Sequence, residues 1–226
     1  IGPSVILPKT LKVSDLMITT GTTTLVDSLH LIGGITVDGS SAELELNSNL
    51  VRITGTSSYF TVTNGGFLKM INAGDSLMVE NGAPIWFDGG SSVTRLKAGK
   101  IFASGNFTQA ATTSNASFAQ NASSTLKTVF NSGGTQTVTF ASPATSFFQD
   151  LELRGSTSTT VALASNIVLK GTLSHDANSI GHGVSSTTAS KMLVTAAGFI
   201  SAASPTTSTN VCLQFLAGTS HGTPSD

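Results

Sequence analysis

Two glutamates at alternating positions are the first residues whose type and spacing could do chemistry. Glu43 and Glu45 flank Leu44, so on a β-strand their carboxylates face the same side, about 7 Å apart. That spacing suits acid–base catalysis or a calcium site, to which Asp27 and Asp38 would add oxygen ligands. The Asp-rich nonapeptide that binds calcium in other β-coils is absent. We therefore keep Glu43 and Glu45 only as calcium candidates, prefer a solvated strand face, and predict no metal site.

A second candidate is the histidine of Gly181-His182-Gly183-Val184-Ser185. A Gly-His-Gly turn before a strand resembles a motif of polygalacturonases, which are parallel β-helices. The resemblance implies clustered carboxylates, one that protonates the leaving oxygen and one that activates water. The nearest preceding acids are Asp150, Glu152 and Asp176, without an adjacent Asp pair, and no Arg-x-Lys follows His182. We therefore predict an exposed turn histidine, no enzymatic activity and no cofactor.

Tyr59 and Trp86 are the candidate ligand contacts. Each is the only residue of its type, and such rings form sugar-binding platforms when their polar edges stay exposed. Trp86 lies between Ile85 and Phe87, so strand alternation points its side chain away from the two apolar neighbours. For Trp86 we prefer a core or coil-stacking role, and a ligand contact is the alternative for which this residue is the best single candidate. Glycans are therefore candidate ligands.

The composition limits the classes of partner. Only 10% of the residues are charged, and 11 basic residues nearly balance 12 acidic ones, which argues against binding to nucleic acid or to an anionic membrane surface. No apolar run reaches the roughly 18 residues of a membrane span. Cys212 is the only cysteine, so neither an internal disulfide nor a cysteine zinc site is possible. About 65 residues are Ser or Thr, a composition common on extracellular and cell-surface proteins.

Short apolar pairs such as Ile35/Val37, Val51/Ile53 and Leu77/Val79 recur about every eight to ten residues between Gly, Asn and Asp turns. No segment carries a helical apolar stripe. Gly-containing corners recur about every 20 to 25 residues, which favours stacked coils. The sequence therefore predicts an all-β, right-handed parallel β-helix or β-solenoid. A β-sandwich is the alternative, and it would require hairpins.

The regularity of the pattern changes along the chain. Residues 1–105 form a first solenoid block, and residues 106–124 relax into small polar residues that predict a loop or a widened coil. A second block with an irregular C-terminal cap is expected over residues 125–226. Because the apolar pairs continue in both blocks, we expect one continuous domain.

A family resemblance lies in the second block. The segments Phe130-Asn-Ser-Gly-Gly-Thr-Gln-Thr-Val-Thr-Phe140, Phe147-Phe-Gln-Asp-Leu-Glu-Leu153, Thr160-Val-Ala-Leu163 and Ile167-Val-Leu-Lys-Gly-Thr-Leu173 resemble repeats of large bacterial surface adhesins. The resemblance covers residues 100–174 best. It implies a cell-surface β-solenoid stalk and carries over no catalytic residue.

These observations predict an extracellular structural or adhesive protein. It would be the shaft of a surface adhesin or a self-assembling fibre subunit, partnered end to end or with neighbouring repeats of a longer protein through exposed strand edges. The alternative is a polysaccharide-processing β-helix, such as a glycosidase, a lyase or a phage tail spike. That alternative requires acids from separate coils to converge in a groove.

Overall fold

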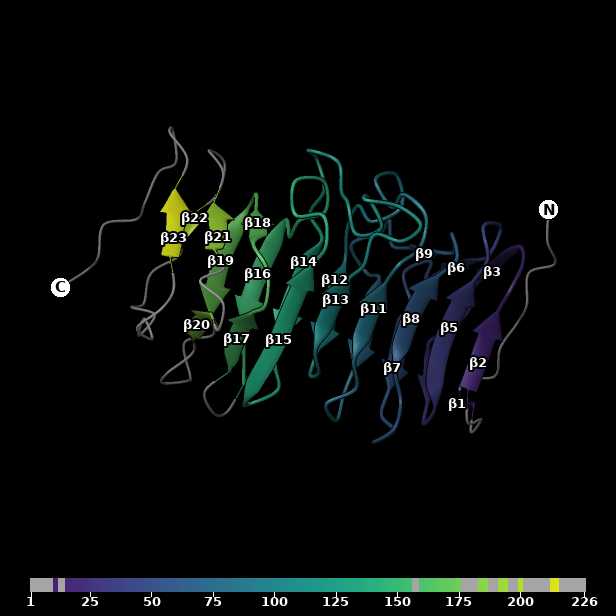
Figure 1. Cartoon of the computed structure of the whole chain (residues 1–226). Coiled ribbons are helices and arrows are strands. Elements are labelled where there is room, and N and C mark those ends of the chain that lie inside the picture. Colours follow the sequence, from purple (N-terminus) through teal and green to yellow (C-terminus); the bar gives the residue numbers. More distant parts are fainter. Residues whose placement is uncertain are drawn as a thin grey trace.

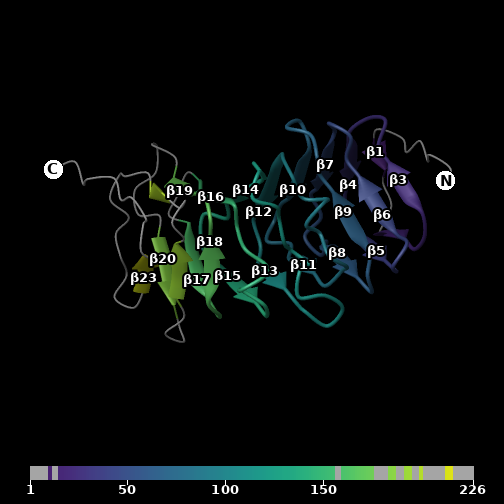
Figure 2. The ribbon, with the colours of Figure 1, turned by 90° about the horizontal axis from the view of Figure 1, so that it is seen from above.

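The computed structural model describes residues 10–11, 15–155, 159–175, 183–186, 191–194, 199–200 and 212–215. Within these residues all paired strands are parallel and no helix occurs. The strands stack side by side in successive coils, with β1 and β2 at one end and β22 and β23 at the other (Figures 1 and 2). The predicted parallel β-solenoid is confirmed. The β-sandwich alternative is wrong, because its hairpins would pair strands antiparallel.

The first face of the solenoid is a nine-stranded sheet. In spatial order its strands are β1 (Thr10–Leu11), β4 (Leu29–Leu31), β7 (Leu50–Ile53), β10 (Ser76–Val79), β12 (Lys100–Ala103), β14 (Lys127–Phe130), β16 (Asp150–Leu153), β19 (Thr172–His175) and β22 (Phe199–Ile200). The register pairs Leu29 with Val51 and Ile101 with Thr128. The length of one coil varies from 19 residues between Asp15 and Gly34 to 31 between Phe107 and Val138, a range that brackets the predicted period.

The second face is an eight-stranded sheet made by the strand that follows in each coil. Its strands are β2 (Asp15–Ile18), β5 (Gly34–Asp38), β8 (Phe60–Thr63), β11 (Ile85–Phe87), β13 (Phe107–Gln109), β15 (Thr135–Phe140), β17 (Thr160–Leu163) and β20 (Gly183–Ser186). Both long sheets run without interruption across residues 106–124. The chain therefore stacks as one continuous unit over that segment.

The third face is regular only toward the two ends of the stack. Near the N-terminal end it consists of β3 (Thr22–Thr24), β6 (Glu43–Glu45) and β9 (Phe67–Lys69), and near the C-terminal end of β18 (Ile167–Leu169), β21 (Lys191–Val194) and β23 (Cys212–Phe215). In the middle, single bridges such as Met70 with Leu96 replace strands. Residues 110–126 connect β13 to β14 without a strand.

The core follows from the alternation that the sequence shows. In strands such as β4 and β11 the first and third residues are buried while the middle one faces outward. Rows of Val, Ile and Leu from successive coils thereby stack inside the solenoid. This burial of apolar side chains is the main stabilising contribution to the fold.

Phenylalanines fill the middle of the core, where the third face has no strands. Phe118 and Phe148 come from the irregular third face, are fully buried, and lie with ring centroids 5.8 Å apart. Phe87 and Phe107 reach them from the second face, each with its centroid within 4.9 Å of Phe118. The Phe118 ring packs edge-on against Phe107 and Phe148, at interplanar angles of 73° and 69°.

Candidate functional site

Trp86 lies on the outer surface of the second face and not in the core. Its side chain is 43% exposed, and it pairs in the ladder with Thr61 on one side and Thr108 on the other. The same outward row continues through Thr36 and Thr139. The fold thus builds an uncharged strip of hydroxyl groups with one indole ring in its middle.

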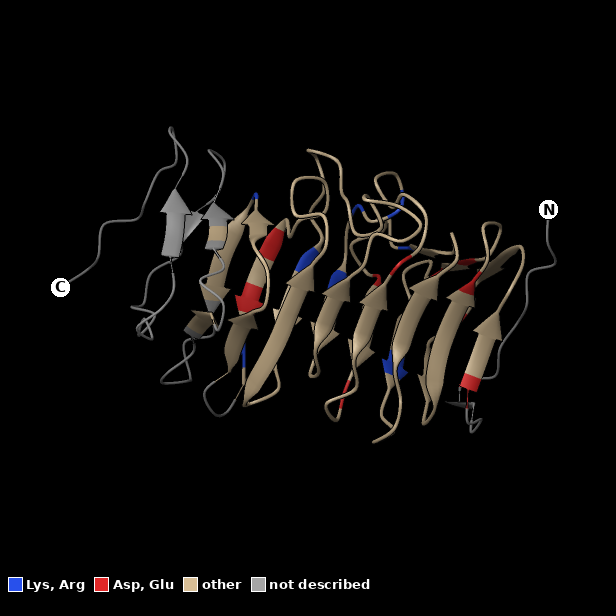
Figure 3. Ribbon diagram, in the orientation of Figure 1, with Lys and Arg blue, Asp and Glu red and all other residues tan. Residues whose placement is uncertain are grey.

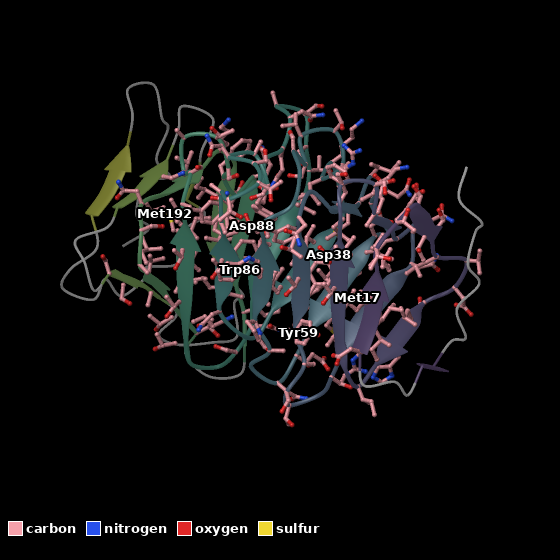
Figure 4. The ribbon with its side chains drawn as sticks, turned by 45° about the vertical axis from the view of Figure 1, so that its right-hand side comes forward. Met17, Asp38, Tyr59, Trp86, Asp88 and Met192 are labelled. Carbon is pink, nitrogen blue, oxygen red and sulfur yellow. The ribbon has the colours of Figure 1, made fainter. Side chains whose placement is uncertain are left out.

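Tyr59 lies on the same face as Trp86, one strand away. It directly precedes Phe60, which pairs with Ile85, the residue before Trp86. The Tyr59 ring packs over Gly34 of the preceding coil, where an added Cβ would lie 2.7 Å from two ring carbons. Figure 4 shows Tyr59 and Trp86 among the side chains of this region. The structure therefore brings the two aromatic candidates onto one surface, with Tyr59 half-buried.

The two glutamates on β6 lie on the third face, and both carboxylates are already paired. Glu45 contacts Lys69 Nζ at 2.8 Å and accepts a hydrogen bond from Thr24 at 3.1 Å. Glu43 contacts Arg95 Nε at 2.8 Å. These ion pairs join adjacent and next-nearest coils. In the part of the chain that the structure describes, no group of three or more His, Cys, Asp or Glu side chains could hold a metal ion.

Aspartates serve mainly as acceptors for backbone N–H groups of neighbouring coils. The pairs are Asp15 with Gly34 N at 3.0 Å, Asp75 with Ser48 N at 2.5 Å, Asp88 with Thr112 N at 2.9 Å and Asp150 with Thr172 N at 2.7 Å. Each carboxylate thereby satisfies a donor at a coil corner. Charged residues are sparse along the strands between these corners (Figure 3).

Glu152 is the described carboxylate with a displaced pKa. Burial alone would raise the pKa of Glu152, but hydrogen bonds from Lys127 Nζ at 3.0 Å and Arg154 Nε at 2.7 Å outweigh it and hold the pKa below the ordinary value. The Arg154 guanidinium also lies 5.8 Å from the centre of the Phe102 ring. This cluster joins β14 to β16 on the outer side of the first face.

Glu152→Gln is expected to lower the free energy of unfolding at pH 7 by about 1–3 kcal/mol, because two charge-assisted hydrogen bonds weaken. Since the folded pKa is lowered, the contribution of Glu152 is present above the unfolded pKa near 4.5. It is lost as the pH falls through the lower folded pKa. Urea unfolding of the wild type and of Glu152→Gln, from pH 7 to well below pH 4.5, measures how the difference in their unfolding free energies changes with pH. A difference between them that stays constant with pH would contradict the assignment.

Two sequence candidates lie outside what the structure can describe. His182 of the Gly-His-Gly turn and Asp176 fall outside the described residues. Cys212 is the first residue of β23, and only its backbone is described. The prediction that His182 is an exposed turn residue therefore stays a prediction.

A groove that the sequence analysis did not identify lies at the corner between the first and second faces. The corner between β12 and β13 comprises only residues 104–106, whereas the corners of the coils on either side comprise residues 80–84 and 131–134. All three corners contribute residues to the lining of the groove. This corner groove has a volume of about 580 Å³ and is lined by Glu80, Asn81, Gly82, Ser104, Asn131 and Ser132.

Gly105 allows the corner of residues 104–106 to lie close to the preceding coil. A Cβ at Gly105 would collide with the carbonyl oxygens of Gly82 and Ala83. The unequal spacing between apolar pairs, Val79 to Ile85 and then Ala103 to Phe107, is the sequence signal that would have revealed the groove.

Comparison of the chain with protein-family models, with curated proteins and with solved structures gave no match. The resemblances to bacterial adhesin repeats and to the polygalacturonase turn therefore stay predictions. Across the described ranges of the chain, no helix has the length and apolar character needed to cross a membrane.

Proposed function

We propose that this chain is an extracellular, non-enzymatic β-solenoid that acts as the shaft of a surface adhesin or as a self-assembling fibre subunit. The observation that carries the proposal is the pair of long parallel sheets, nine and eight strands deep, which run through the whole described stack. Each interior coil hydrogen-bonds to the coils above and below it, which makes the unit a rigid rod.

The use of the carboxylates supports a structural function over polysaccharide cleavage. Glu43, Glu45 and Glu152 pair with basic side chains, and Asp75 and Asp88 bind backbone N–H groups. A glycosidase needs two carboxyl groups that are free to exchange protons with substrate and water. These five side chains are instead used to hold coils together.

End-to-end association of such rods would occur by strand addition. Among the described strands, β2 pairs only with β5. Ile35 N donates to Tyr59 O of the following coil at 2.9 Å, and alternate residues of a parallel strand bond to opposite neighbours. Leu16 is the register partner of Ile35, so its backbone N–H points toward β5. The N–H of the next residue, Met17, therefore points away from β5. A second copy that adds a strand at this edge would use the Met17 N–H.

Negative-stain electron microscopy across a concentration series tests the proposal. Filaments in the wild-type protein would identify a fibre subunit, and single short rods would identify a shaft; globular particles would contradict both. Met17→Pro is expected to abolish filaments without changing the thermal unfolding midpoint, because Pro is tolerated at a strand edge. Filaments of unchanged length in Met17→Pro would contradict assembly through β2.

A further inference from the structure

Trp86 exposes an indole ring in the middle of a sheet face that otherwise carries small polar groups. The ring is 43% exposed, and its register partners on the two neighbouring strands are threonines. Pro84 lies two residues before Trp86 and is exposed as well. Its carbonyl accepts a hydrogen bond from Phe60 N at 3.0 Å, which places Pro84 beside the half-buried Tyr59. Tyr59, Pro84 and Trp86 therefore occupy adjoining positions on one outer surface.

Threonines continue this surface on both sides of Trp86. One outward residue from each of five successive strands forms a row that we call the hydroxyl strip: Thr36, Thr61, Trp86, Thr108 and Thr139. Within the part of the chain that the structure describes, the four threonine hydroxyls make no hydrogen bond to another residue. By contrast, the Thr24 hydroxyl on the third face donates to Glu45. The hydroxyls of the strip are therefore available to donate to a ligand and to accept from it.

The charges around the hydroxyl strip exclude charged ligands. None of its five strands carries Lys or Arg, so a polyanion such as nucleic acid finds no counter-charge. The nearest carboxylates are Asp38, the last residue of β5, and Asp88, which follows β11 (Figure 4), and they would repel an anion. Asp38 already accepts from Asn64 Nδ2 at 2.6 Å and Asp88 from Thr112 N at 2.9 Å. The surface therefore fits an uncharged ligand that forms hydrogen bonds.

The dimensions of the hydroxyl strip separate a sugar chain from a protein partner. At about 4.8 Å between strands and about 3.3 Å per residue, the surface from Thr36 to Thr139 and from Tyr59 to Thr63 covers about 250 Å². A stable complex buries about 800 Å² on each partner, so the strip is too small for a second copy of the chain. Each of its strands already pairs on both sides, so a peptide cannot add to the sheet here.

We propose that the hydroxyl strip binds a linear, uncharged glycan that lies across the strands. One sugar ring stacks on Trp86, and the rings on either side of it form hydrogen bonds with the threonine hydroxyls. A pyranose ring suits both kinds of group, because its face presents C–H groups and its edge presents hydroxyls. This inference rests on the adhesive part of the proposed function and gives it a ligand class.

Calorimetry and indole fluorescence on the full chain test the hydroxyl strip. The neutral probes are cellotetraose, maltotetraose, mannotetraose and tetraacetylchitotetraose, and tetragalacturonate is the anionic counterpart. Trp86 is the only tryptophan, so a sugar ring stacked on it changes the emission and shields the indole from quenching by acrylamide. We expect at least one neutral probe to have both effects, and tetragalacturonate to have neither.

Two variants of the strip and one control locate the binding. Trp86→Ala should weaken binding of that neutral probe by about tenfold or more, equivalent to at least about 1.4 kcal/mol. Thr61→Val removes one hydroxyl and keeps the shape of the side chain, so it should weaken binding by about threefold or more and keep the wild-type thermal unfolding midpoint. Val26→Ala is the matched control, because Val26 is 54% exposed at the corner between β3 and β4, away from the second face. It should bind like the wild type.

Several results would overturn the glycan site. They are no binding of any neutral probe by the wild type, unchanged binding in Trp86→Ala, an equal loss in Val26→Ala, and tighter binding of tetragalacturonate than of the neutral probes. If Trp86→Ala also lowers the unfolding midpoint, Thr61→Val decides, and wild-type affinity in that variant would contradict the proposal.

Two further measurements separate this proposal from association between copies of the chain. Trp86 emission that changes with protein concentration in the absence of glycan would overturn the glycan site, because the strip would then be a contact between copies. Micrographs of the same preparations test the proposed function independently. Rods or filaments that bind no probe contradict the glycan site and leave the structural function standing.

Discussion

Replacing Phe107 with alanine should lower the free energy of unfolding by about 3–5 kcal/mol, the cost of deleting a buried phenylalanine ring. Phe107 is fully buried on β13. Its ring centroid lies 5.7 Å from Phe87, 4.9 Å from Phe118, 6.2 Å from Phe130, 5.9 Å from Phe140 and 5.3 Å from Phe148. The ring therefore joins strands of both long sheets to the irregular third face, and no neighbour can move in to fill the cavity without leaving its own row.

Urea denaturation followed by the fluorescence of Trp86, the only tryptophan, measures this effect. Trp86 is a suitable reporter because β11 is hydrogen-bonded to β13, the strand that carries Phe107. Phe102→Ala is the matched control: Phe102 is a half-buried residue on the outer side of β12, so its loss should cost below about 1 kcal/mol. Equal losses in the two variants would show that the aromatic cluster is not the centre of stability.

The fold could be predicted because the strand signal is local. Alternating pairs such as Ile35/Val37 lie on strands with the predicted face inward, and the corner glycines and asparagines adopt positive φ, as at Asn64 and Gly65. The irregular middle of the third face could not be predicted in detail. Phe118 is buried there by contacts with rings from four other segments, and no local pattern specifies such contacts.

The candidate contacts were predictable to different degrees. The outward direction of Trp86 follows from alternation on its own strand. Its position in a row with Thr61 and Thr108 depends on register, which is set by corner lengths that differ from coil to coil. Glu43 and Glu45 are on one side of β6, as the spacing predicts. Their partners could not be predicted, because Arg95 is 52 residues from Glu43 in the sequence.

Asp75→Ala should lower the free energy of unfolding by about 2–4 kcal/mol, because it removes the charged acceptor of two part-buried backbone N–H groups, and hydrogen bonds to charged groups contribute about 1.5–3 kcal/mol each. Asp75 is only 1% exposed. Its carboxylate accepts from Ser48 N of the preceding coil at 2.5 Å and from Asn72 N of its own corner at 2.9 Å. The side chain thus satisfies donors from two coils at once, which no shorter side chain at this position can do.

Asp27→Ala provides the matched control for Asp75→Ala, since the same atoms are removed from another corner. Asp27 is exposed, and its carboxylate accepts from the adjacent Ser28 N at 2.7 Å, a donor that water can reach when the carboxylate is gone. The control should therefore change stability by less than about 0.5 kcal/mol. Urea unfolding at pH 7 compares the two variants. If Asp75→Ala loses no more unfolding free energy than Asp27→Ala, the corner carboxylates do not hold the coils together. That result would contradict a structural use of the acidic residues.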